Sequence, residues 1–96
     1  MHPDERVRIV METARAVLED RLDAATGART LLLQQEQIVA RLRSDRIDVT
    51  QAEADTVALT LRRLAEQVTD RVEALDDPAS NREMARILGE LAQALR

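Results

Sequence analysis

The 96-residue chain contains no cysteine, no lysine and no Phe, Tyr or Trp, and its only histidine is His2. Without cysteine there is no thiolate nucleophile and no thiolate metal site. Without lysine there is no Schiff-base chemistry and no phosphate-binding loop of the Gly-Lys-Ser/Thr kind. One histidine beside a terminus cannot build a zinc site from a single chain and argues against a Ser/His/Asp triad. We therefore expect a protein that is not an enzyme, with no cofactor, no metal and no small-molecule ligand.

The length and charge of the chain indicate one small helical domain, residues 1–96, rather than a membrane or nucleic-acid protein. The net charge is −4 with 33% charged residues, which argues against a general nucleic-acid binder. The longest apolar run is Leu31-Leu32-Leu33, far short of the ~18–20 residues that span a membrane. Because the N-terminus shows no secretory leader pattern, we expect a cytoplasmic protein. Each aromatic side chain buries about 150–250 Å² of surface, so a core without aromatic residues buries less apolar area. This smaller core favours self-association.

Apolar residues recur at helical spacing nearly everywhere, and Gly and Pro total only four. We predict an all-α protein, an antiparallel up-down four-helix bundle with helices at about 3–25, 28–44, 50–76 and 78–95. Thr26-Gly27 is the expected first break, with a kinked continuation through Gly27 as the alternative. The sequence from Thr50 to Glu53 fits a capping box at the start of the third helix. Asp77 before Pro78 is the expected cap of the last helix, and the alternative is that this helix starts three residues later.

Each predicted helix has one apolar stripe that would face the core. The expected stripes are Val7, Met11, Ala14, Leu18, Leu22 and Ala25; Leu31, Gln35, Ile38, Val39 and Leu42; Val57, Leu61, Leu64, Val68, Val72 and Leu75; and Met84, Ile87, Leu88, Leu91 and Leu95. Gln35 on the second stripe is either a buried polar residue or a boundary residue whose amide reaches solvent.

Three aliphatic residues lie on the side opposite these stripes. At 100° per residue, Ile9 lies about 200° from Val7, Leu33 about 200° from Leu31, and Leu59 about 160° from its stripe. Scattered exposed aliphatic residues are common, and the alternative is a second apolar surface for a partner. The small residues that accompany two of them would let another helix approach. The candidate interface is Ile9, Ala16, Leu33, Ala40 and Leu59.

Two charged clusters support alternative functions. The acidic row Glu66, Asp70, Glu73 and Asp77 could hold Mg²⁺, as in all-α hydrolases, although the E-x-x-E motif of such enzymes is absent. The cluster Arg41, Arg43 and Arg46 could contact phosphate, as in a nucleic-acid accessory protein, although cations also suit a helix C-terminus.

From these features we expect a non-catalytic interaction module, such as an adaptor, an assembly or immunity-type factor or a regulatory subunit. It would act through helix faces on a protein partner or a second copy of itself, as a homodimer.

Overall fold

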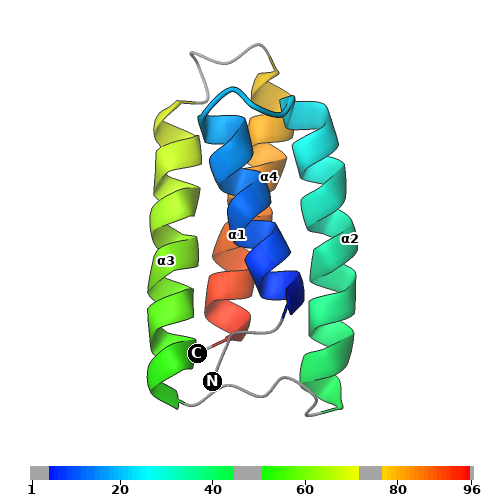
Figure 1. The fold of residues 1–96 in the computed structure, drawn as a ribbon, viewed down its shortest axis with the longest axis vertical. Helices are drawn as coiled ribbons and strands as arrows, with labels where there is room; N and C mark the ends of the chain where they lie inside the picture. The colour runs from blue at the N-terminus through cyan, green and yellow to red at the C-terminus, as the bar shows by residue number, and fades with distance from the viewer. Residues whose placement is uncertain (1–4, 45–50, 72–76, 96) are drawn as a thin grey trace.

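The structure, a computed structural model, describes residues 5–44, 51–71 and 77–95 and contains four helices (Figure 1). They are α1 (Glu5–Leu18), α2 (Ala24–Arg43), α3 (Gln51–Asp70) and α4 (Pro78–Ala94). The predicted all-α four-helix bundle is thus confirmed. Within the described segments there is no strand, and none of their helices is long and apolar enough to span a membrane.

The four helices stand at the corners of a bundle in which direction alternates along the chain (Figure 1). α1 and α4 each pack against both α2 and α3. Hence α1–α2 and α3–α4 are antiparallel neighbours, as short links favour, whereas α2 and α3 lie at diagonally opposite corners. The outer faces of α2 and α3 therefore point to opposite sides of the molecule.

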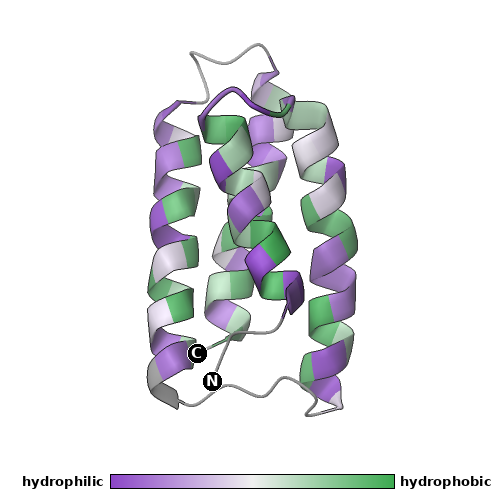
Figure 2. Cartoon of the chain, in the orientation of Figure 1, coloured by the Kyte–Doolittle hydropathy of each residue, from purple (hydrophilic) through white to green (hydrophobic). Residues whose placement is uncertain are grey.

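An entirely aliphatic core fills the bundle. The largest fully buried apolar residues are Leu31, Ile38, Leu61, Met84, Ile87, Leu88, Leu91, Val10 and Val68. The stripe of α4 is buried as predicted, and so are the described residues of the α3 stripe. On α1 the buried face is rotated slightly, so that Val10 and Val17 are buried and Leu18 is partly buried. Ala25, predicted on the first stripe, is instead an exposed residue of α2. Figure 2 shows apolar and polar residues alternating around each helix.

The predicted break at Thr26-Gly27 is wrong, because the chain turns earlier. α1 ends at Leu18, and Asp20 adopts a φ of 60°, a left-handed conformation that Asp tolerates better than most residues. The Asp23 carboxylate then accepts a 2.8 Å hydrogen bond from the backbone N–H of Thr26 and caps α2. Gly27 is consequently a helical residue of α2, and it is buried.

Gly27 serves close packing rather than a turn. A Cβ atom at this position would lie 2.6 Å from Cγ2 of Val17 and 3.2 Å from Sδ of Met84. These distances are shorter than the ~3.5–4.0 Å of favourable carbon contacts. The absence of a side chain at Gly27 therefore lets α1, α2 and α4 meet closely at this end of the bundle.

Arg71, the residue that follows α3, contacts the C-terminal end of α1. The Arg71 guanidinium donates a hydrogen bond to the carbonyl oxygen of Leu18, and its Nη2 lies 4.0 Å from Oδ2 of Asp20. A cation at a helix C-terminus satisfies a carbonyl that no intrahelical donor reaches. This contact accompanies the end of α1 at Leu18, seven residues before the predicted end at Ala25.

The last helix begins where its sequence predicts. Asp77 caps α4, since its carboxylate accepts hydrogen bonds from the Ser80 backbone N–H at 3.1 Å and from the Ser80 hydroxyl at 2.7 Å. Pro78 occupies the first turn. Asn81 is completely buried one turn later, and its Nδ2 donates to the Asp77 carbonyl at 2.8 Å. α4 therefore does not start at the later capping box.

Several predictions fall on residues outside the described segments. These are the helix start at Pro3, the Thr50 half of the capping box, Arg46, and the stretch 72–76 that was assigned to the third helix. α3 itself ends at Asp70, followed by a turn at Arg71.

Candidate interaction surface on the second helix

The two glutamines at the centre of α2 define which of its faces is buried. Nη1 of Arg6 on α1 donates to Oε1 of Gln34 at 3.3 Å. Nε2 of Gln35 donates to Oε1 of Glu90 on α4 at 2.7 Å. α1 and α4 therefore flank the core-facing side of α2, and the remaining side is its outer face. Gln34 is the buried glutamine, whereas Gln35 is the boundary residue.

The outer face of α2 carries two adjacent exposed leucines. Leu33 is 53% exposed and Leu32 is 41% exposed. The helical repeat of 100° per residue places Leu33 on the α1 side of this face and Leu32 on the α4 side. Ala40, two turns after Leu33, is also exposed. Leu33 and Ala40 were predicted from sequence, whereas Leu32 was missed because it continues an apolar run from the buried Leu31.

Ile9 of α1 extends this apolar surface. α1 and α2 are antiparallel, and Arg6 lies level with Gln34 near one end of their contact while Val17 lies level with Gly27 near the other. This register places Ile9 at the height of Leu33. Ile9 follows Arg6 by three residues, which keeps it on the α2 side of α1. Ile9 and Ala16 are partly buried, so they form the edge of the surface rather than its centre.

Leu59 does not belong to the same surface. It is 45% exposed on the outer face of α3, at the corner diagonal to α2. Its neighbours one turn away are all exposed and mostly charged or polar: Asp55, Thr56, Arg62 and Arg63. The outer face of α2 thus carries Leu33 and Ala40, whereas Leu59 lies on a different helix at the diagonal corner of the bundle.

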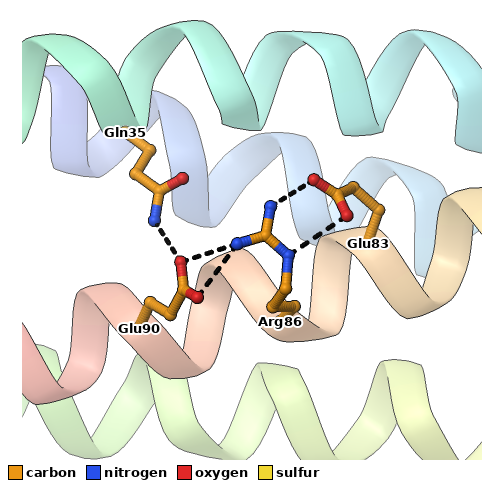
Figure 3. A network of polar contacts seen from close by, with 4 residues as sticks. All are labelled: Gln35, Glu83, Arg86 and Glu90. Atoms are coloured by element: carbon orange, nitrogen blue, oxygen red, sulfur yellow. Dashed lines mark hydrogen bonds and ion pairs between the residues drawn. The ribbon is translucent and has the colours of Figure 1, made fainter.

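A polar network on α4 reaches Gln35 of α2 (Figure 3). Arg86 lies between Glu83 and Glu90 on α4, and its Nη1 donates to both Glu90 oxygens at 2.8 and 2.9 Å. Its Nε donates to Oε2 of Glu83 at 3.1 Å. The hydrogen bonds from Arg86 lower the pKa of Glu83, and those from Gln35 and then Arg86 lower the pKa of Glu90. The pKa of Arg86 is raised by the same hydrogen bonds, so all three groups are held in their charged forms.

An open groove of about 490 Å³ lies between α1 and α3. Leu18 and Leu64 form its apolar part, and Arg15 and Arg63 contribute guanidinium groups from its two sides. Neither arginine side chain makes a hydrogen bond or an ion pair with another residue in the described ranges. Glu19 also lines the groove, and its carboxylate is paired with Arg21.

Of the acidic row predicted as a metal site, Glu73 lies outside the residues that the structure describes. Glu66 and Asp70 are exposed on α3, while the Asp77 carboxylate caps α4. The hydrogen bonds from Ser80 lower the pKa of Asp77. No group of three or more His, Asp or Glu among the described residues is placed to hold a metal ion.

Of the predicted arginine cluster, the structure describes two members at the end of α2. Arg43 is exposed, and Arg41 is partly buried and engaged with a neighbouring group.

Among the described side chains, Leu32 and Leu33 thus form an exposed apolar pair on the outer face of α2, and charged groups of α4 lie on one side of that helix. Comparison with known proteins adds no relative: the chain matches no protein-family model, no curated protein sequence and no solved structure.

Proposed function

We propose that the protein is a non-catalytic helical interaction module that acts in the cytoplasm as a homodimer, through the outer face of α2. The observation that carries this proposal is the exposure of Leu32 and Leu33, two adjacent leucines at the centre of a 20-residue helix. An adaptor, an assembly or immunity-type factor and a regulatory subunit all use helix faces in this way.

The magnitudes favour a weak, reversible contact. Complete burial of a leucine contributes roughly 1.5–3 kcal/mol. A dimer would bury four leucines that are each about half exposed, which gives on the order of 3–6 kcal/mol of gross transfer free energy. Association costs about 4–15 kcal/mol of lost translational and rotational freedom. The leucines therefore need support from the polar residues around them, and the net affinity is modest.

The test is to replace one exposed leucine and compare it with a matched control. Leu33→Asp puts a charge at the centre of the proposed surface, while Leu59→Asp makes the same change at an equally exposed site on the opposite side. Sedimentation velocity over a range of concentrations would measure association. Interference detection is required because the chain has no Tyr or Trp.

We expect the wild type and Leu59→Asp to associate above the 10.8 kDa monomer, and Leu33→Asp to remain monomeric. The proposal fails if Leu33→Asp associates as the wild type does, because the α2 face would then be irrelevant to binding. A wild type that stays monomeric at the highest concentration would contradict the homodimer.

A further inference from the structure

The outer face of α2 carries residues that match in pairs around the midpoint between positions 32 and 33. From the centre outwards, the pairs are Leu32 and Leu33, Arg29 and Glu36, and Ala25 and Ala40. All six residues are exposed. The inner pair is apolar, the middle pair has opposite charges, and the outer pair is small.

Helical geometry places the charged pair at the centre of this face. At 1.5 Å per residue, Arg29 and Glu36 lie about 5 Å on either side of the midpoint along the helix axis. They are seven residues apart, so they differ by only about 20° around the helix. Leu32 and Leu33 diverge to the two sides of that line. The face therefore has a central line of charge with an apolar residue on each side.

A second copy fits this face in the antiparallel direction. A two-fold axis through the midpoint sets Arg29 of one copy opposite the partner's Glu36, and by symmetry the same ion pair forms again on the other side of the axis. The leucines meet at the axis. Small residues at Ala25 and Ala40 let the two helices approach at both ends of the contact.

The charges also select the direction of the pairing. A parallel arrangement in register would set Arg29 against the partner's Arg29 and Glu36 against the partner's Glu36. Like charges placed opposite each other disfavour that alternative and thereby give specificity. The charges of Arg29 and Glu36 sum to zero, so these two residues add no net repulsion between two copies, each of which carries a net charge of −4.

Arg29 and Glu36 are available for such a contact. Neither side chain forms a hydrogen bond or an ion pair with a residue in the described segments, although, in addition to the hydrogen bonds that cap α2, the charge of Arg29 contributes to lowering the pKa of Asp23. By contrast, Arg21 and Arg86 each hold a carboxylate within 3 Å in the same chain. Arg29 and Glu36 are thus two opposite charges that an intermolecular partner can use.

We infer that the partner bound by the α2 face is a second copy of this chain, held as an antiparallel α2–α2 pair about a two-fold axis between Leu32 and Leu33. This inference rests on the proposed function and adds the partner, the direction and the ion pair between Arg29 and Glu36. Ile9 borders the contact on one side and the Glu83–Arg86–Glu90 network on the other. The contact therefore combines leucines that meet near the axis with charged residues on the centre line and along one edge.

Charge-reversal variants test the register. In Arg29→Glu both facing positions are acidic, and in Glu36→Arg both are basic, so each variant alone would lose at least tenfold in dimer affinity. A mixture of the two variants restores both ion pairs across a heterodimer. Sedimentation velocity of the wild type, each variant and their equimolar mixture measures this, with Arg62→Glu on the outer face of α3 as the control for net charge.

We expect dimers for the wild type, for Arg62→Glu and for the mixture, and monomers for each single variant at the same concentration. Restoration in the mixture also excludes misfolding as the cause of the loss. If Leu33→Asp abolishes the dimer while the charge variants keep it, the antiparallel register is wrong and the α2 face stands. If the charge variants and Leu33→Asp all dimerise as the wild type does, both the register and the proposed function are overturned. A monomeric wild type overturns the inference directly.

Discussion

The two glycines of the chain provide a matched test of the packing between α1, α2 and α4. Both lie inside helices, where Gly→Ala alone stabilises by about 0.5–1 kcal/mol. At Gly89 an added Cβ meets no atom within 4 Å, so the full gain is expected. At Gly27 the added Cβ would lie 2.6 Å from Cγ2 of Val17.

The clash at Gly27 is difficult to relieve. Val17 is 3% exposed and β-branched, so one side-chain rotamer dominates in the helix. Met84 is unbranched and can adjust. Overpacking of this kind costs about 1–3 kcal/mol, and the helical gain offsets part of it. We expect Gly27→Ala to lose about 1–2 kcal/mol and Gly89→Ala to gain about 0.5–1 kcal/mol.

Urea unfolding followed by far-UV circular dichroism measures both variants, at one low protein concentration so that association does not contribute. A double-mutant cycle with Val17→Ala adds a check. Because truncation of Val17 removes the clashing atom, Gly27→Ala should cost less in the Val17→Ala background. A Gly27→Ala variant as stable as Gly89→Ala would refute the close approach of the three helices.

Two further predictions concern the core and the helix caps. Leu64→Ala should lower the free energy of unfolding, measured in urea melts, by about 2–5 kcal/mol because Leu64 is 5% exposed. Leu59→Ala should lower it by well under about 1 kcal/mol. Comparable losses in the two variants would show that Leu59 is buried. Hydrogen bonds from Thr26 and Ser80 lower the folded-state pKa values of Asp23 and Asp77 below 3.8. Their stabilising effect is therefore complete above pH 3.8 and is lost as the pH falls through the lower folded-state values. Asn also caps helices but does not titrate. In the double variant Asp23→Asn and Asp77→Asn, the melting temperature should therefore fall less than in the wild type as the pH is lowered into the acid range. An equal fall in both proteins would contradict the capping role.

The sequence predicted the existence of all four helices because apolar periodicity is a local signal. The stripe of α4 and the Asp77-Pro78 start need only neighbouring residues to be recognised, and both are confirmed. The predicted end of the first helix was wrong because two candidate breaks lie within a few residues of each other. Gly27 resembles a helix terminator in isolation, and only the tertiary approach of Val17 and Met84 shows that it is a packing glycine.

The candidate interface stays a prediction, and the sequence alone could not group its residues for a similar reason. A helical wheel finds exposed residues such as Leu33 and Leu59, but it does not tell which helices are neighbours. The diagonal placement of α2 and α3 puts these two leucines on opposite sides of the bundle. The role of Gln34 likewise depends on Arg6 approaching from α1. The pairing of Arg29 with Glu36 becomes visible only once the outer face of α2 is known.

Disulfide trapping tests the α2–α2 contact most directly, since the chain has no cysteine of its own. Leu33→Cys places one thiol beside the proposed two-fold axis, where two such residues come within the ~4.4–6.8 Å between Cα atoms that a disulfide spans. Leu59→Cys places an equally exposed thiol on the opposite side of the bundle. After mild oxidation, non-reducing electrophoresis should show a covalent dimer for Leu33→Cys and mainly monomer for Leu59→Cys. Equal cross-linking of the two variants would contradict the account.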